Sequence, residues 1–444
     1  MQVKTRRQCE KKNKTELATR QQWQGLTPSV HGHCLSFCSL SDLAACARVS
    51  QLWCQVSRTI RDRWTRLVIH GGLLQGTSRI VPWLKWTHRF AQQMPNLRQV
   101  VLATSPRPSL KHLCHVLASH PHVDSLCLEN QGCLLLNRYG PKQLKRQLIP
   151  IFKCPGHAPL RKWRYKGDKG PLGQWDEKRY SGQELVTLLC ACSQRSLQEF
   201  IWTGGRWSTN YRFDMETVLS LVQLPDLHTF DATGFGFDDE IDTLPLAKAL
   251  VQRAASVPWQ WFGIRWSLNE AAIAEFTLVQ HAHLHSLFLV VPRATPEAVL
   301  LTIFRACPSL VRLGLEGSDQ LSDRGLEQVA RHYLPRIQQL LLDVAYEHSP
   351  SAKLDILTDT IAPRLTRLVL DQCLQVSLDQ VVRFLQTAVQ LQCLSHINVM
   401  QNENDIAVKF YGNRSVVVWN RQVWNAIKAT PFGLLCRPEF QDGK

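Results

Sequence analysis

One short pattern of apolar positions, apolar-x-x-apolar-x-apolar, recurs along the chain from residue 64 onward. In the second half, successive copies begin 25, 26, 27, 28 and 29 residues apart. Chance triplets of apolar residues would not keep such a period over five consecutive units. The twelve copies begin at Trp64, Leu97, Val123, Leu160, Leu197, Leu227, Trp259, Leu284, Leu310, Ile337, Leu365 and Leu394.

A period of this length is typical of leucine-rich repeats, in which each unit of about 20–29 residues holds one strand and one helix. We therefore expect an α/β fold in which a curved solenoid of about twelve strand–helix repeats occupies residues 64–400. The first half is less regular, because the spacing there stretches to 37 residues. Irregular loops are predicted at roughly 130–158, 166–182 and 203–213.

The segments between the apolar patterns carry helix signals. Ser377 to Gln380 reads Ser-x-x-Gln, the pattern of a capping box. Thr295-Pro296 predicts an N-cap followed by proline at the first helical position. Beyond the last repeat, residues 401–444 are expected to form a cap and tail, because terminal repeats need a cover for their exposed core. Val416–Val418 is the predicted closing strand, and Trp424 is the predicted cover.

The alternation within each strand predicts which residues reach the concave face. The apolar triplet points into the core, so the residues between its members line the inner surface, where solenoids usually bind partners. The early strands present cations there, the middle strands present aromatic residues, and Glu316, Asp343 and Asp371 give the late strands acidic residues. The substrate-binding candidates are Lys162, Arg164, Ile201, Trp261, Arg265 and Phe288. Two alternatives stay open: Trp261 packs under a loop, or the register is shifted by one residue.

A helical segment precedes the repeats. Its signals are Leu26, the pair Asp42-Leu43, the closing Val49 to Trp53, and Trp64 to Leu67 at its exit. This order resembles an F-box, with Thr27 in place of the usual proline and Cys34 and Cys38 where larger aliphatic residues are common. The later run Leu321 to Leu326, Leu-Ser-Asp-x-Gly-Leu, resembles the repeats of the F-box/leucine-rich-repeat family.

The resemblance implies a three-helix F-box-like module at residues 25–68 and a receptor that is not itself an enzyme. Members of this family are substrate-recognition subunits of Skp–cullin–F-box ubiquitin ligases. By analogy, the module would bind a Skp-family adaptor and, through it, a cullin ligase, while the concave face would bind a substrate protein. The adaptor-binding residues would be Leu26, Val30, Leu35, Leu43, Val49 and Trp53. The alternative is an interaction scaffold outside any ligase, in which the F-box-like hairpin caps the N-terminal end of the solenoid.

The positive charge of this sequence is concentrated in two segments. The formal net charge is +16, of which residues 1–20 carry +5 and residues 130–180 carry +9, so the rest is nearly neutral. Residues 1–24 are expected to be a basic disordered tail. Nucleic-acid binding through the two basic segments ranks last among the hypotheses, because those segments are predicted loops with few interleaved aromatic residues.

The remaining composition adds no catalytic chemistry. The chain contains no Gly-rich phosphate loop, Gly-x-Ser-x-Gly or His-Glu-x-x-His motif, and we expect no cofactor. His31 to Cys34 lacks a second cluster with zinc-finger spacing, so no metal site is expected. The 15 cysteines are scattered among apolar residues, as in proteins of reducing compartments. With no signal peptide and no long apolar run, a cytoplasmic or nuclear protein without a membrane anchor is predicted.

Overall fold

The computed structural model describes most of the chain beyond residue 95. The described residues are 66–70, 96–104, 110–129, 139–166, 180–203, 211–234, 242–254, 256–292, 294–317, 321–343, 350–402, 405–412 and 414–440. The predicted basic tail at residues 1–24 lies outside them, as does the predicted F-box-like module at residues 25–68 apart from its last three residues.

Fifteen strands of the described residues form one continuous sheet. Strands β1 to β14 that belong to it pair in parallel and follow chain order. Strands β5 (Tyr180–Ser181) and β7 (Tyr211–Arg212) form a separate two-stranded sheet. The parallel strands are β1 (Arg66–His70), β2 (Gln99–Thr104), β3 (Ser125–Glu129), β4 (Lys162–Lys166), β6 (Glu199–Thr203), β8 (Thr229–Ala232), β9 (Trp261–Ser267), β10 (Ser286–Val290), β11 (Arg312–Glu316), β12 (Gln339–Asp343), β13 (Arg367–Val376) and β14 (Cys393–Asn402). The last two positions of each of the twelve apolar patterns therefore lie within one strand.

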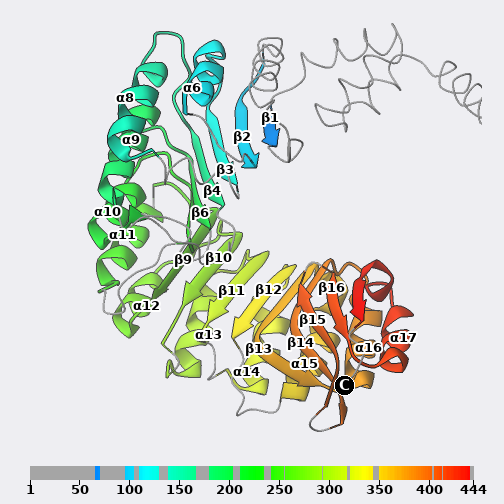
Figure 1. Ribbon diagram of the computed structural model, residues 1–444. Coiled ribbons are helices and arrows are strands. Elements are labelled where there is room, and N and C mark those ends of the chain that lie inside the picture. Colours follow the sequence, from blue (N-terminus) through cyan, green and yellow to red (C-terminus); the bar gives the residue numbers. More distant parts are fainter. Residues whose placement is uncertain are drawn as a thin grey trace, which may run out of the picture.

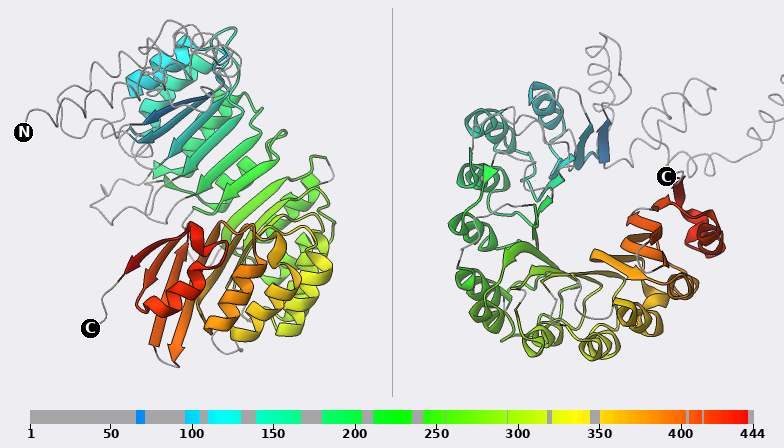
Figure 2. Two further views of the ribbon diagram at one scale, coloured as in Figure 1. Left: turned by 90° about the vertical axis from the view of Figure 1, so that its right-hand side faces the viewer. Right: turned by 60° about the horizontal axis from the view of Figure 1, so that its bottom comes forward.

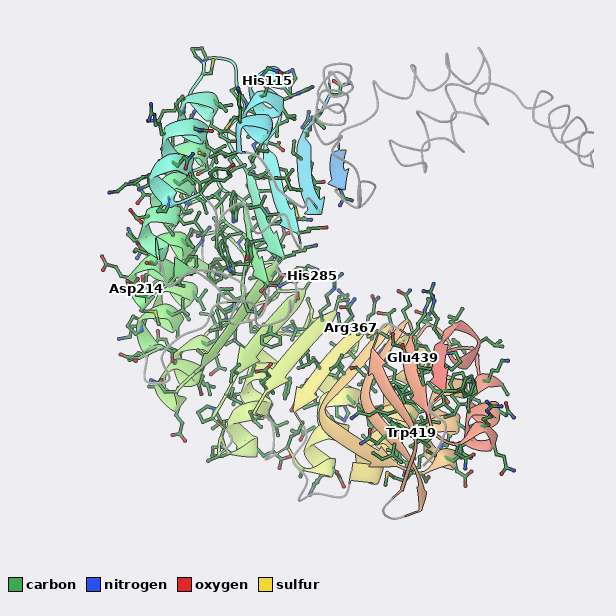
Figure 3. All side chains as sticks on the ribbon, viewed as in Figure 1. His115, Asp214, His285, Arg367, Trp419 and Glu439 are labelled. Carbon is green, nitrogen blue, oxygen red and sulfur yellow. The ribbon has the colours of Figure 1, made fainter. Side chains whose placement is uncertain are left out.

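Helices connect consecutive strands and cover one face of the sheet. They are α6 (Leu110–Ser119), α8 (Pro141–Phe152), α9 (Gly182–Ser193), α10 (Met215–Val222), α11 (Leu244–Ala254), α12 (Glu270–Phe276), α13 (Glu297–Ala306), α14 (Asp323–Gln328), which continues as a π-helix over Val329–Tyr333, α15 (Pro350–Thr360) and α16 (Leu378–Thr387). The sheet bends into an open arc with the strands on the inner side and the helices on the outer side (Figure 1 and Figure 2). His115 and Asp214 mark the outer layer in Figure 3, and Arg367 marks the inner one.

The chain ends in a different arrangement. Strand β15 (Asp405–Gly412) pairs antiparallel with β14, and β16 (Ser415–Val418) pairs antiparallel with β15. Helix α17 (Arg421–Lys428) follows, and β17 (Arg437–Phe440) pairs in parallel with β16. The closing strand predicted at Val416–Val418 is present, and Trp424 is buried as expected, with 3% of its surface exposed.

The interior between sheet and helices is one continuous apolar core. The row formed by the second residue of each apolar triplet is aromatic from β4 to β9. In it Phe200 stacks on Phe230 with ring centroids 5.7 Å apart, and Phe230 on Phe262 at 5.8 Å. Tyr165 stacks on Trp202 at 4.1 Å. Leucines take over this row from β10 onward.

A repeated backbone contact sets the register of the strands. The carbonyl of the residue ahead of one strand accepts two N–H groups from the start of the next strand. Asp124 accepts from Arg161 at 2.7 Å and from Lys162 at 3.0 Å. Thr366 accepts from Gln392 at 2.8 Å and from Cys393 at 3.2 Å. Every copy of this contact aligns equivalent residues of neighbouring repeats.

Two arginines, the buried Arg253 and the half-buried Arg364, close turns that lead from helix to strand. The Arg253 guanidinium donates to the carbonyls of Val222, Pro225 and Leu227 and lies over the Trp259 ring, 4.7 Å from its centroid. Burial lowers the pKa of Arg253 to about 10. The Arg364 guanidinium likewise donates hydrogen bonds to the carbonyls of Ala330 and Leu334, each at 3.3 Å.

Three expectations need correction. Helix α8 occupies Pro141–Phe152, where a loop was predicted, because Leu144, Leu148 and Phe152 form a buried helical face. Pro296 rather than Thr295 is the N-cap of α13, and Thr295 is buried with 1% exposed.

The predicted start of the last apolar pattern, Leu394, is also wrong, because it lies three residues too late. Leu394 pairs with Leu368, so Leu391 is the residue equivalent to Leu365. Ahead of β14, Leu391 N–H donates to the Ala388 carbonyl at 3.0 Å, as Leu365 N–H does to Ala362 at 3.1 Å. The irregular pairing between Val369 and Leu374 hides this shift from the apolar spacing. The capping box at Ser377, by contrast, is present with both of its hydrogen bonds.

Candidate functional site on the concave face

The concave face is built from residues that alternate with the core triplet on each strand. Because the strands pair in register, equivalent residues form rows that cross the sheet, with neighbouring strands about 4.8 Å apart. The first row runs through Lys162, Glu199, Thr229, Trp261, Ser286, Arg312, Gln339, Arg367 and Cys393. The second row runs through Arg164, Ile201, Asp231, Gly263, Phe288, Gly314, Leu341, Val369 and Ser395.

The cations of β4 are paired within the sheet. Glu199 accepts a hydrogen bond from Nε of Arg164, and its Oε2 lies 4.0 Å from Nζ of Lys162. Glu129 Oε1 lies 3.6 Å from Nζ of Lys166. The hydrogen bond to Glu199 raises the pKa of Arg164. This end of the face therefore carries three cations against two anions and offers little free charge to a partner.

Ile201, on the second row beside these ion pairs, is 6% exposed. The expectation that Ile201 is an exposed apolar contact is wrong, because its side chain is buried on the sheet. It presents almost no surface to a partner.

Trp261 and Phe288 meet in a hollow that spans β6 to β13 and has a volume of about 400 Å³. Both side chains are half-buried, as is Leu341 on β12. The Arg312 guanidinium lies over the Trp261 ring, 5.2 Å from its centroid, a cation–π contact. The hollow is lined by Thr203, Asp231, Thr233, Trp261, Ser286, Leu287, Phe288, Arg312, Leu313, Gly314, Gln339, Leu340, Leu341 and Arg367.

A glycine shapes the floor of this hollow. A Cβ at Gly314 would overlap the Phe288 ring at Cδ2. Because Gly314 has no side chain, the Phe288 ring of the neighbouring strand can lie across the sheet at this position. The ring in this position forms one wall of the hollow.

Asp231 supplies the only carboxylate among the described residues that line the hollow. It is 4% exposed, and its Oδ1 accepts from the Thr233 N–H at 3.1 Å and from the Thr233 hydroxyl at 2.7 Å. Desolvation raises the pKa of Asp231 to about 6, although the Thr233 hydrogen bonds act in the opposite direction. The carboxyl is held in the floor of the face and is not presented to solvent.

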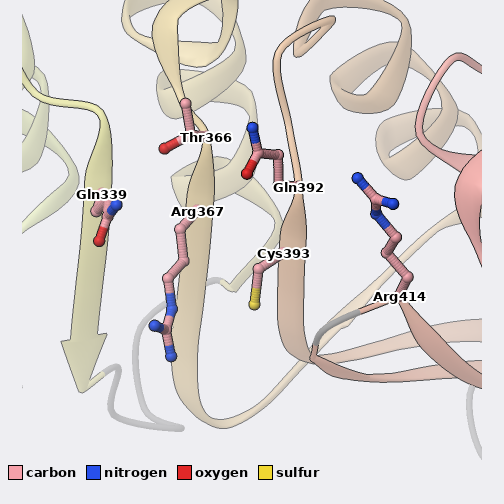
Figure 4. A pocket seen from close by; sticks show the side chains of 6 residues that line it. All are labelled: Gln339, Thr366, Arg367, Gln392, Cys393 and Arg414. Carbon is pink, nitrogen blue, oxygen red and sulfur yellow. The ribbon is translucent and has the colours of Figure 1, made fainter. Parts of the chain in front are cut away.

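A second hollow of about 420 Å³ adjoins the first and shares Gln339 and Arg367 with it. Its remaining lining residues are Thr366, Gln392, Cys393 and Arg414 (Figure 4). Arg414 follows β15 in the turn to β16, so the C-terminal hairpin contributes to the concave face. No described carboxylate lies within 4.0 Å of Arg312, Arg367 or Arg414.

The structure brings two of the six substrate-binding candidates, Trp261 and Phe288, into one hollow. Lys162 and Arg164 lie three strands away from Trp261 on the same face. The side chain of Arg265 lies outside the described residues, as do the six adaptor-binding candidates Leu26, Val30, Leu35, Leu43, Val49 and Trp53.

The sequence analysis missed Asp231, Arg312, Leu341 and Arg367. Each occupies a position in its repeat equivalent to Trp261 or Phe288. Aligning the repeats by their apolar triplets would have found these four residues. The late acidic row is only partly described: Val290 pairs with Glu316 and Asp343 with Asp371 along the strands.

Other chemistry is sparse in the described part of the chain. It contains no group of three or more His, Cys, Asp or Glu side chains placed to hold a metal ion. Burial raises the pKa of the Cys127 and Cys192 thiols to about 12, which keeps them protonated. None of the described helices combines the length and apolar character needed to cross a bilayer.

Comparison with known proteins gives structural neighbours only. No family model and no curated protein matches the sequence. The leucine-rich-repeat-containing protein LegL7 from Legionella pneumophila is 17% identical, with 69% of this chain and 90% of that one covered and a TM-score of 0.33. Rad7 in its yeast complex with Elc1 is 12% identical, with 84% and 92% covered and a TM-score of 0.43. The chain itself, by its repeated parallel strands and outer helices, folds as a leucine-rich-repeat solenoid.

Proposed function

We propose that this chain is a protein-binding receptor that performs no chemistry itself and holds a partner protein on the concave face of its sheet. The hollow at Trp261, Phe288 and Leu341 carries this proposal. It places half-buried aromatic and aliphatic side chains at the centre of a wide polar surface, the arrangement in which binding energy concentrates at protein interfaces. A rigid solenoid also keeps that surface preformed.

We further propose that the receptor belongs to a Skp–cullin–F-box ubiquitin ligase and acts in the cytoplasm or nucleus. The support is the resemblance of Leu26 to Trp53 to an F-box, together with the position of β1. Strand β1 begins at Arg66, 13 positions beyond Trp53, and pairs with β2 at one end of the sheet. An adaptor bound there would sit at the end of a solenoid that holds the substrate, so the receptor would contribute proximity and orientation.

Co-purification of the intact chain with a Skp-family adaptor tests the ligase proposal. Leu43→Asp and Trp53→Ala are expected to abolish adaptor binding, because both residues belong to the F-box resemblance. Trp261→Ala is the matched control, since it removes an aromatic residue of the concave face and is expected to leave adaptor binding unchanged. Absence of the adaptor from purified wild-type complexes would overturn the proposal.

The second candidate is a scaffold outside any ligase whose N-terminal segment only caps the solenoid. The direct pairing of β1 with β2 favours it, because an uncapped terminal repeat exposes its core. Deletion of residues 1–60 separates the two functions. A soluble, folded array that has lost adaptor binding supports the ligase receptor, whereas aggregation of the truncated chain together with no adaptor binding by the intact chain supports the cap.

A further inference from the structure

We propose that the concave face recognises an acidic, extended peptide segment that carries one bulky apolar side chain. The apolar side chain would enter the hollow at Trp261, Phe288 and Leu341, and carboxylates of the segment would pair with Arg312 and Arg367. This proposal rests on the proposed protein-binding function and specifies the kind of partner it selects.

Arg312 and Arg367 place positive charge on the concave face that no described carboxylate neutralises. Arg312 and Arg367 are both exposed, stand in the first row at one rim of the hollow, and have no carboxylate within 4.0 Å among the described side chains. Lys162 occupies the same row on β4, and there Glu199 lies within ion-pair distance. The sheet thus neutralises its own cations at β4 and leaves those at β11 and β13 for a ligand. Arg414 extends the same rim into the second hollow.

The spacing of these cations indicates the shape of the ligand. Strands β11 and β13 are separated by β12 alone, so their first-row residues stand about 9.6 Å apart at the usual strand spacing of about 4.8 Å. A polyproline-II segment rises about 3.1 Å per residue, and three residues span about 9.3 Å and return to the same side. A segment that crosses the strands in this conformation would present acidic residues at positions i and i+3 to Arg312 and Arg367.

The hollow provides the apolar anchor. The Phe288 ring lies across Gly314, the Trp261 ring is held under the Arg312 guanidinium, and Leu341 faces them from β12. Its volume of about 400 Å³ lies in the range of small ligand-binding pockets. A leucine or phenylalanine side chain therefore fits, and burying it stabilises the complex while the charges fix its orientation.

Asp231 argues against a polyanion in the same place. Its carboxyl lines the floor of the hollow and repels a second negative charge above it. A nucleic-acid strand, with a charge at every residue, would suffer that repulsion, whereas a peptide can place a neutral side chain there. The mixed lining of two cations at the rim, apolar walls and a carboxyl floor therefore favours an acidic-apolar peptide.

The test uses full-length protein and a fluorescein-labelled peptide with two glutamates three residues apart and one phenylalanine between them. Fluorescence anisotropy should show saturable binding that weakens as salt increases. Arg312→Gln and Arg367→Gln should each weaken binding about tenfold, the effect expected for loss of a hydrogen bond to a charged group. Arg324→Gln is the matched control, because Arg324 is exposed on α14 in the outer helical layer. Thermal unfolding of every variant checks that the fold is retained.

Peptide variants complete the design. Replacing both glutamates by glutamine, or phenylalanine by alanine, should each weaken binding to the wild-type chain about tenfold or more. Absence of saturable binding, equal binding of the neutral peptide, or displacement of the peptide by single-stranded nucleic acid at lower concentration would each overturn the proposal. If a partner protein binds in a manner sensitive to Trp261→Ala but insensitive to both arginine variants, the receptor function stands and the acidic specificity is refuted.

Discussion

Single residues on the concave face determine the shape of its hollow. Gly314 carries no side chain, and the Phe288 ring occupies the space that a Cβ would need. Asp231 is a carboxyl buried in an otherwise apolar and hydroxyl-lined floor. Neither residue belongs to a recognisable sequence motif. Each affects the hollow through its contacts with residues of a neighbouring strand.

Replacing Gly314 by valine should destabilise the protein and reshape the hollow. The new side chain would displace the Phe288 ring, and overpacking of this kind costs about 1–3 kcal/mol. Gly263→Ala is the milder companion, because a Cβ there meets Asp231 Oδ1 and Thr233 Cγ2 at 3.3 Å, a tight contact that a shift of a few tenths of an ångström relieves. Urea unfolding measures both changes, and equal stability of Gly314→Val and wild type would contradict the described position of the ring.

Replacing Asp231 by asparagine should change how stability depends on pH. The folded pKa of about 6 lies above the ordinary value of 3.8, so the native state binds a proton that the unfolded state has already released between these values. The contribution of Asp231 is therefore most favourable below about pH 4 and is lost as pH rises through about 6. At neutral pH the loss is on the order of 3 kcal/mol.

Urea unfolding of wild type and Asp231→Asn at pH 4, 5.5 and 7 checks this sign. The free energy of unfolding of the variant relative to wild type should increase with pH over this range. A constant difference would mean that the carboxyl titrates alike in the folded and unfolded chain.

At the scale of elements, each strand–helix unit is attached to the next by backbone contacts and by a few buried side chains. The double N–H contact ahead of the strands recurs from β3 to β14 and aligns the repeats whatever their length. Arg253 adds a side-chain link, since its guanidinium satisfies three carbonyls of the α10–β8 turn. Such carbonyls would otherwise be buried without a donor.

Arg253→Met should cost about 2–4 kcal/mol, because methionine keeps the packing on Trp259 but leaves three carbonyls without donors. Arg364→Met should cost less, since Arg364 serves two carbonyls at longer distances. Hydrogen exchange should show lost protection of amides around Leu224 to Thr229 in the first variant alone. Unchanged exchange there would contradict the role assigned to Arg253.

The whole molecule is an open arc, so both of its ends need protection. At the C-terminal end, β15 and β16 turn the sheet antiparallel, and α17 covers the last repeat with Trp424 and Ile427. This cap converts a long unpaired strand edge on β14 into a paired one. It also carries Arg414 into the concave face.

Removal of residues 403–444 should make the protein aggregate, because it exposes the edge of β14 and the core beneath α16. Removal of residues 441–444 alone is the control and should leave the oligomeric state of the wild-type protein unchanged. Size-exclusion chromatography with light scattering distinguishes the outcomes. A monomeric, folded product of the larger deletion would show that the cap is dispensable.

Twelve strands and their inward and outward faces were predictable from the apolar pattern, because that information is local: side chains of a strand alternate, and the triplet marks the buried side. Helix α8 was predicted as a loop although Leu144, Leu148 and Phe152 recur at i, i+4 and i+8, because the long repeat spacing and the surrounding basic residues favoured an irregular segment. The late placement of the last repeat has a different origin, because the irregular pairing of β13 with β14 leaves no mark in the spacing of apolar residues.

The sequence by itself thus determined the repeat, its period and the candidates Trp261 and Phe288. Only the tertiary structure decided which of them act together, because contacts across the sheet join residues some 25 to 37 positions apart. Glu199 neutralises Lys162 and Arg164, and Ile201 is covered, whereas Arg312 and Arg367 remain unpaired among the described side chains. The charge that a partner meets is therefore set by strand register, which no single repeat encodes.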